Sequence, residues 1–322
     1  MGRIQTVSLL GQEVTLYSLL AVCFSLICGL ALAYRFKKRG WKTRNGLLFS
    51  LLAALLGVLL GRIVYCLVRY DMFEDPMGRS LGIRPFFELN VGSLSVIGVI
   101  GGVLLAALIL GKVMKKPTGA VLDAASAPGL FLFFLLRLVE PLSGQGFGPL
   151  MENPVLCWVP LGMQNGWGDW SLSVCFIEAV ILLSFCATAA IMKPRREGTL
   201  ALCVLFLLAV CQVVPESLRR DNVLRIFIFA RVTQIGYAVI LFCCALAAWL
   251  RGRKRGLPRR TIFIEAGLVL LGIVLLIAGE FALDKTSWPD GAIYAVMLLI
   301  LSLMAVLILR RIFQEDRRKA AA

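Results

Sequence analysis

The sequence predicts an all-α, polytopic integral membrane protein built as a helical bundle. Of its 322 residues, 59% are hydrophobic and only 16% are charged, whereas a soluble domain carries about 25% charged residues. Several apolar stretches are long enough, or nearly so, to cross about 30 Å of hydrocarbon. These expected spans lie near residues 15–34, 47–68, 92–113, 118–139, 171–192, 198–214, 226–250, 261–282 and 291–309, and the sixth is the shortest.

The basic residues predict how these spans are oriented. Lys and Arg are concentrated in alternate loops, at residues 35–44, 112–116, 193–196, 251–260 and 310–319. Because basic loops stay on the cytoplasmic side, we expect the N-terminus outside and the C-terminus in the cytoplasm, as an odd number of spans requires. The net charge of +15 is therefore explained by topology, and we expect no nucleic-acid partner.

Composition also limits the chemistry. The chain contains no histidine, which excludes histidine metal ligands and an imidazole base. Of the ten cysteines, only Cys157 falls in an expected loop, and no Cys-x-x-Cys spacing occurs. Thiols within apolar runs behave as small hydrophobic side chains. We therefore expect no metal, no disulfide and no cofactor.

A basic linker predicts two parts in the chain. Residues 253–260 hold five basic side chains with a Gly and a Pro. We expect residues 1–252 to form a seven-span membrane domain, and residues 253–322 to form the linker, a two-helix transmembrane hairpin and a cytoplasmic tail. No internal repeat suggests a transporter built from inverted halves.

The end of the fourth expected span is the first candidate for a site. Arg137 and Glu140 are three residues apart and so share a helix face. Pro141 then ends the helix, while Gly144 and Gly148 allow close backbone approach. A charged pair at the membrane edge is costly and indicates function. In the alternative, Arg137 extends to the headgroups and Glu140 is its solvated partner.

The segment after this pair is unusual for a loop. Residues 144–170 contain no Lys or Arg but are rich in Gly, Pro and Trp. Tryptophan prefers the headgroup region, so we expect this segment to lie along the outer membrane surface. It is also longer than a plain connection needs, which suggests that it covers a site.

Other polar side chains recur in the outer halves of the expected spans. Several arginines facing one membrane cavity would suit the phosphate of an anionic lipid, because guanidinium is a planar, permanently charged fork. For any one arginine, extension to the headgroups is the simpler explanation. Arg-x-x-Glu and Glu-x-x-Arg pairs at matched depth favour a cavity. These side chains are Tyr17, Arg62, Glu178, Glu216, Arg219, Arg231 and Gln234.

Seven short segments occur in a specific order along the chain. They are Leu16-Tyr17-Ser18-Leu19-Leu20, Gly61-Arg62-Ile63-Val64-Tyr65, Gly92-Ser93-Leu94-Ser95-Val96-Ile97-Gly98, residues 123–148 with Arg137, Gly144 and Gly148, Glu178-Ala179, Glu216-x-x-Arg219, and Thr233-Gln234-Ile235. In order, spacing and topology, the region from about residue 8 to 250 resembles the bacterial prolipoprotein diacylglyceryl transferases, which are seven-span membrane enzymes.

The resemblance implies an activity. Such an enzyme moves a diacylglyceryl group from phosphatidylglycerol to the lipobox cysteine of a prolipoprotein signal peptide, at the bilayer of the bacterial plasma (inner) membrane. Arg137 and Arg219 would hold the phosphate, and Glu140 or Tyr17 would be the thiol base. The substrate site would further include Arg62, Gly144, Gly148, Glu178, Glu216, Arg231 and Gln234.

The sequence also departs from the family pattern. The third-span histidine of the family is Ile97 here, and the histidine before the fifth-span glutamate is Leu172. The signature asparagines are Glu140 and Ser143, and the signature glutamate is Gln145. Two alternatives to the transferase hypothesis are therefore kept. One is a non-catalytic paralogue that binds lipid or lipoprotein, and the other is a membrane transporter or scaffold whose charges stabilise helix packing.

Overall fold

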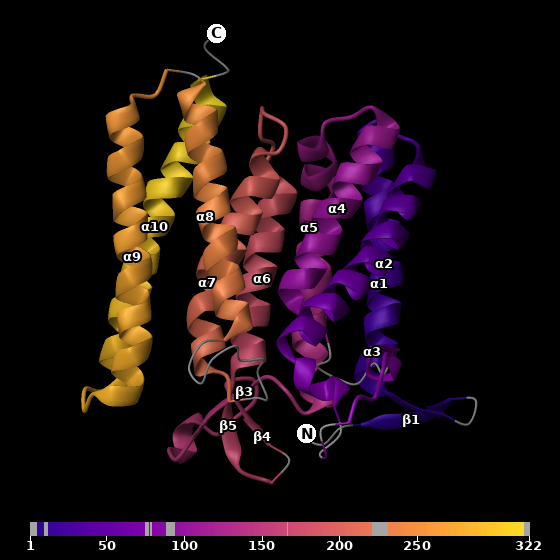
Figure 1. Cartoon of the computed structure of the whole chain (residues 1–322), viewed down its shortest axis with the longest axis vertical. Helices are drawn as coiled ribbons and strands as arrows, with labels where there is room; N and C mark the ends of the chain where they lie inside the picture. Colours follow the sequence, from indigo (N-terminus) through magenta and orange to yellow (C-terminus); the bar gives the residue numbers. More distant parts are fainter. Residues whose placement is uncertain are drawn as a thin grey trace. The chain divides into compact units, whose positions relative to one another are not determined.

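The computed structural model describes residues 5–9, 12–74, 77, 79–87, 94–165, 167–220, 231–254 and 256–318. In these residues, nine helices are long and apolar enough to cross a membrane, so the expected multi-pass helical architecture is confirmed (Figure 1). The helices are α1 (Leu16–Lys38), α2 (Thr43–Val68), α4 (Val96–Met114), α5 (Thr118–Val139), α6 (Val174–Ile191), α7 (Thr199–Leu218), α8 (Val232–Arg253), α9 (Arg259–Lys285) and α10 (Asp290–Arg318).

Some helix ends differ from those expected. The fifth span begins at Val174 rather than 171, because Trp170–Ser173 is a β-strand. The sixth continues through Pro215 to Leu218, which is tolerated in a membrane helix because neighbouring groups can satisfy the freed carbonyl. The expected starts of the third and seventh spans, at 92 and 226, lie outside the described residues.

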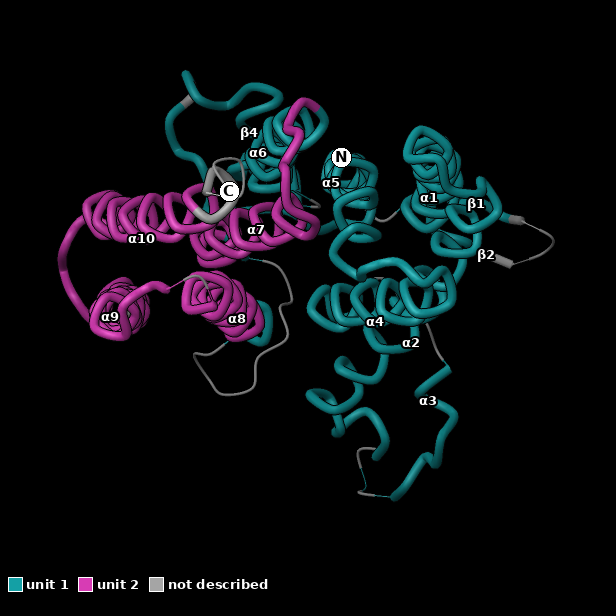
Figure 2. The backbone as a smooth tube through the Cα atoms, turned by 90° about the horizontal axis from the view of Figure 1, so that it is seen from above, with its two compact units in different colours: residues 1–190, 219–233 teal, residues 191–218, 234–322 magenta. Residues whose placement is uncertain are grey.

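The chain forms two compact units (Figure 2). Unit 1 comprises Met1–Ala190 and Arg219–Thr233, and therefore holds α1, α2 and α4 to α6. Unit 2 comprises Ile191–Leu218 and Gln234–Ala322, so that α7 and α8 group with α9 and α10. The domain boundary expected near residue 253 separates α8 from α9, whereas both helices belong to unit 2. That boundary stays a prediction.

Small residues let two helices of unit 1 approach closely. A Cβ added at Gly102 of α4 would lie 2.5 Å from the backbone nitrogen of Gly57 on α2. One turn earlier, Gly98 lies against the backbone of Leu60 in the same way. Within a bilayer, helices gain van der Waals contact through such small-residue faces. Gly98 and Gly102 are four residues apart on α4, and together they let α2 and α4 approach closely.

We expect Gly102→Ala to destabilise the protein by about 1–3 kcal/mol, because the added methyl group overlaps backbone atoms that cannot rotate away. Thermal unfolding in detergent would measure this loss. Gly101→Ala is the matched control, since its Cβ would meet no atom closer than the Leu60 Cδ1 at 3.9 Å. Equal melting temperatures for the two variants would contradict the proposed role of this contact.

Outside the helices, the described residues form two small antiparallel sheets. The first pairs β1 (Thr6–Leu9) with β2 (Gln12–Thr15), directly before α1. The second has the order β3-β5-β4, from β3 (Phe147–Leu150), β4 (Gly162–Gln164) and β5 (Trp170–Ser173). Short helices complete these segments, namely η1 (Tyr70–Phe73), α3 (Arg84–Phe87), η2 (Glu140–Ser143) and η3 (Pro154–Leu156).

The strands of the three-stranded sheet are spread along the segment expected to lie along the membrane surface, from Phe147 onward. Its last strand, β5, runs directly into α6, and Phe147 on β3 is opposite Ser173 on β5. The sheet therefore holds the glycine-rich stretch after α5 against the first turn of α6. Trp158 and Trp167 are both exposed. Their placement at the headgroups stays a prediction.

Candidate functional site

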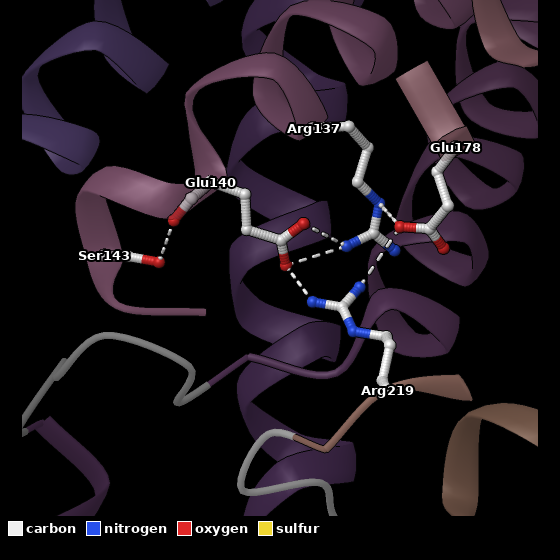
Figure 3. A network of polar contacts seen from close by, with 5 residues as sticks. All are labelled: Arg137, Glu140, Ser143, Glu178 and Arg219. Carbon is white, nitrogen blue, oxygen red and sulfur yellow. Dashed lines mark hydrogen bonds and ion pairs between the residues drawn. The ribbon is translucent and has the colours of Figure 1, made fainter. Parts of the chain in front are cut away.

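Four charged side chains of unit 1 form a closed set of ion pairs, which we call the charge ring (Figure 3). Arg137 Nη1 donates to both carboxylate oxygens of Glu140, at 2.8 and 2.9 Å. Arg137 Nε lies 3.1 Å from Glu178 Oε2, and Arg219 Nη1 donates to that same oxygen at 3.3 Å. Arg219 Nη2 closes the ring by donating to Glu140 Oε1.

The local sequence explains how each member reaches the ring. Arg137 lies in the last turn of α5, and Glu140 begins η2 three residues later. Pro141 prevents α5 from continuing, and the hydroxyl of Ser143 donates to the Glu140 carbonyl at 2.6 Å. Glu178 lies on α6, one turn after its start, and Arg219 directly follows α7 in the sequence. Three separate segments thus meet at one point.

The charge ring is buried and electrically balanced. Arg137, Glu140 and Arg219 are each 6% exposed, and Glu178 is 0% exposed. Two guanidinium groups and two carboxylates carry no net charge, and each ion contacts two of the opposite sign. Burying charges is costly unless they are paired and hydrogen-bonded in this way. Arg137 and Glu140 therefore lie inside the protein and do not extend to solvent.

The glycine-rich stretch after η2 forms one side of the site. Gly144 and Gly146 have φ values of 75° and 91°, a left-handed conformation that glycine adopts without steric cost. A Cβ at Gly146 would lie 2.7 Å from Cys175 Cβ and 3.6 Å from the Glu140 carboxylate carbon. A Cβ at Gly148 would lie 2.8 Å from Val174 Cγ2. The glycines therefore allow the start of α6 to approach.

Cys175 is a residue of the site that sequence reasoning missed. Its side chain is fully buried, and its backbone nitrogen donates to the Gly146 carbonyl at 3.2 Å. In the sequence it was one of many cysteines within apolar runs. A signal was nevertheless present, since Cys175 precedes Glu178 by three residues and so shares its helix face.

Tyr17 lies beside the charge ring. It is half-buried in the first turn of α1, and α1 contacts η2, the segment that carries Glu140. The residue before β1 helps to hold Tyr17 there. Gln5 donates its backbone nitrogen to the Leu142 carbonyl of η2 at 3.2 Å, and its carbonyl accepts from the Leu16 nitrogen at 2.8 Å.

Other candidate residues have different surroundings. Arg62 is buried on α2 and donates to the backbone carbonyls of Phe86, at 2.9 Å, and Pro85, so it holds α3. Arg231 is half-buried directly before α8. Glu216 and Gln234 belong to unit 2. Glu216 is buried there, and Gln234 donates to Glu280 Oε1 at 3.0 Å.

Comparison with known proteins identifies the family. Residues 5–251 match the family model described as prolipoprotein diacylglyceryl transferase, and this match covers well over half of the chain. The chain belongs to the prolipoprotein diacylglyceryl transferase family. None of the curated proteins matches the sequence. The resemblance seen in the sequence is thus confirmed, and at family level it indicates a membrane transferase of lipoprotein biosynthesis with lipid and lipoprotein substrates.

The charge ring lies wholly within the part that matches the diacylglyceryl transferase family. Its members come from three family-like segments, which contain Arg137, Glu178 and Arg219. In the resemblance described from the sequence, Glu140 stands at a signature asparagine and Gln145 at the signature glutamate. Glu140 is the carboxylate that contacts Arg137 through both oxygens. The ring in this form therefore depends on a departure from the family pattern.

The site offers little to a metal ion. Searching the described residues finds no group of three or more His, Cys, Asp or Glu side chains arranged to hold one. The two carboxylates of the charge ring are already engaged by guanidinium groups. Its chemistry is that of paired arginines, carboxylates, a phenol and a buried thiol.

Proposed function

We propose that this protein transfers a diacylglyceryl group from phosphatidylglycerol to the lipobox cysteine of a prolipoprotein. The observation that carries the proposal is the convergence of Arg137 and Arg219, far apart in the sequence, on the same two buried carboxylates. Two guanidinium forks facing one point suit a phosphodiester. The reaction would take place in the outer half of a bacterial plasma membrane, with the N-terminus outside and the C-terminus in the cytoplasm.

Binding of the lipid phosphate requires an exchange within the charge ring, because both arginines are already neutralised. Glu140 is the carboxylate that we expect to be displaced. It lies on the short η2 segment, whereas Glu178 is held within α6 and is fully buried. The phosphodiester carries one negative charge, as a carboxylate does, so it can take over the contacts of Glu140 with the two guanidinium groups. The freed carboxylate would then be available to accept a proton.

The chemistry follows from this exchange. The freed Glu140 takes the proton of the lipobox thiol. The thiolate then attacks the carbon of the diacylglyceryl group that is bonded to the phosphate oxygen. The carbon–sulfur bond forms as the carbon–oxygen bond breaks, and glycerol phosphate leaves with the electron pair. Arg137 and Arg219 stabilise the additional negative charge of this leaving group. Because the chain has no histidine, the base has to be another group, and Tyr17 is the second candidate.

One observation favours a second function. The four charges of the ring pair with one another, so the ring can also serve as a buried link between α5, α6 and the segment after α7. On this alternative the protein is a non-catalytic paralogue that binds lipid or lipoprotein. The absence of histidine from the chain points in the same direction.

A reconstituted assay with diacylglyceryl-labelled phosphatidylglycerol and a lipobox peptide separates these functions. Label on the peptide cysteine would establish the transferase. Binding of phosphatidylglycerol that depends on Arg137, without transfer, would establish the non-catalytic paralogue. With neither transfer nor binding, the ring would be a packing device, as in the transporter or scaffold alternative.

We expect Glu140→Gln to lower turnover roughly 10²–10⁴-fold, the range typical of a lost general base. Initial rates in the same assay would measure this. Glu178→Gln is the matched control, because it removes an equal charge from the same ring but not the proposed base. If the two variants lose turnover equally, the effect comes from the unbalanced ring. If Glu140→Gln keeps its turnover, Glu140 is not the base.

A further inference from the structure

The terminal helices α9 and α10 lie outside the residues that match the family, which end at 251. Within unit 2 they are nevertheless joined to α7 and α8 by two carboxylates of α9. Glu280 accepts hydrogen bonds from the Gln234 amide at 3.0 Å and the Ser217 hydroxyl at 3.1 Å. Glu265 accepts from Trp249 Nε1 at 2.9 Å and pairs with Arg311 of α10.

These two contacts have matching register. Glu265 and Glu280 are 15 residues apart on α9, and their partners Gln234 and Trp249 are also 15 residues apart on α8. The order of the pairs is reversed between the two helices, as it must be when antiparallel helices lie side by side. Fifteen residues correspond to about 22 Å along a helix, so the two contacts are far apart. Sliding α9 by one residue would break both contacts. The pairing of the hairpin with α8 is therefore specific at both ends.

Glu280 and Glu265, near opposite ends of α9, contact different kinds of residue. Gln234 lies in the family-like segment Thr233-Gln234-Ile235, and Ser217 lies inside Glu216-x-x-Arg219. The Ser217 hydroxyl is also 3.4 Å from the Tyr294 hydroxyl of α10. Glu280 and Tyr294 thus contact two polar residues that belong to family-like segments. At the other end, Glu265 contacts a tryptophan and an arginine outside those segments.

We propose that the terminal hairpin positions the transferase segment that carries Arg219. Ser217 precedes Arg219 by two residues, so a hydrogen bond that fixes Ser217 also fixes the end of α7 from which that segment departs. Glu280 is the positioning residue, because its carboxylate ties Ser217 and Gln234 together. Hydrogen bonds to a carboxylate are among the stronger ones in proteins. Glu265 anchors the hairpin without this role.

The expected effect of Glu280 on turnover rests on the proposed function. Its expected effect on the stability of the end of α7 does not. The test compares Glu280→Gln with Glu265→Gln in the full-length chain. Glutamine keeps the shape of the side chain but replaces one of the two accepting oxygens by an NH2 group, so it cannot accept from Ser217 and Gln234 at the same time. Both variants remove one charge from α9, so they are matched in chemistry and differ in position.

Hydrogen–deuterium exchange of peptides that cover residues 210–220 and 231–238 is the first measurement. We expect Glu280→Gln to speed exchange there roughly tenfold and Glu265→Gln to leave it unchanged, because local opening follows the loss of local contacts. Equal exchange in the two variants would overturn the proposal, whatever the protein's activity.

Turnover with labelled phosphatidylglycerol is the second measurement. We expect kcat to fall roughly tenfold in Glu280→Gln, with the KM for the lipobox peptide unchanged and Glu265→Gln near wild type. Ser217→Ala should cause a similar loss, and its combination with Glu280→Gln should add little, since both remove the same hydrogen bond. Additive losses, or faster exchange with unchanged kcat, would overturn the positioning role.

If the wild-type protein transfers no label, the proposed transferase function fails on its own. The exchange experiment still decides the inference in that case, because it reports on the α7 end and not on the chemistry. The double variant is informative in the same way, with exchange as the readout. Failure of the function and failure of the positioning role are thus distinguishable.

Discussion

Replacing Arg137 by alanine is expected to lower diacylglyceryl transfer roughly 10²–10³-fold, the effect typical of losing a group that stabilises charge in the transition state. The physical reason is that Arg137 supplies one of the two guanidinium forks at the point where the leaving phosphate gains charge. Its removal also leaves Arg219 as the remaining arginine of the charge ring between Glu140 and Glu178. Initial rates with labelled phosphatidylglycerol would measure the loss.

Arg311→Ala is the matched control for this prediction. It breaks a partly buried ion pair with Glu265 on α9, as Arg137→Ala breaks the pairs of the charge ring. Loss of one partner of a buried pair costs about 3–5 kcal/mol of stability, so both variants should melt at lower temperature. Only Arg137→Ala should lose transfer at temperatures where both remain folded. Parallel losses of transfer would show that Arg137 acts through stability alone.

Gly146→Ala is expected to reduce both folding and transfer. The backbone at Gly146 has φ of 91°, which strains an alanine by about 1–3 kcal/mol. The new Cβ would also overlap Cys175, whose Cβ is 2.7 Å away, and such overpacking costs about 1–3 kcal/mol more. The displaced atoms belong to Cys175 on α6, three residues before Glu178. Thermal unfolding and transfer rates would report the two effects.

Gly168→Ala separates the two causes. Gly168 has an almost identical φ of 92°, but a Cβ there would have no neighbour within 4 Å. It should therefore show the backbone strain alone and keep its transfer rate. Cys175→Gly removes the atom in the way and should partly restore the Gly146→Ala variant. If Gly168→Ala is as damaging as Gly146→Ala, the close approach at Cys175 is not important.

The membrane spans could be found from the sequence because the bilayer imposes a simple rule. Backbone groups in hydrocarbon must be hydrogen-bonded within the span, so a long apolar stretch has to be helical. That rule does not apply to the segments outside the spans. The sheet formed by β3, β4 and β5 was therefore not predicted, and the start of α6 was placed three residues too early, within β5.

The site residues were named in the sequence as separate candidates. Arg137, Glu140, Glu178 and Arg219 each combine a charge near a span end with family-like neighbours. Only Arg137 and Glu140 were related by helical spacing, because the other contacts join residues far apart in the chain. Arg62 has the same sequence features, yet in the structure it donates to backbone carbonyls of α3.

The sequence by itself determines that this protein crosses the membrane many times, which family it belongs to, and which charges are costly enough to require partners. Hydropathy and motif order are properties of neighbouring residues, and they can be read directly. The tertiary structure alone decides which partners those charges have. It joins Arg137 and Arg219 to the same two glutamates, brings Cys175 against Gly146, and links Glu280 to Ser217 and Gln234. Ion pairs and hydrogen bonds depend on distance in space, and the packing of helices from separate parts of the chain sets that distance.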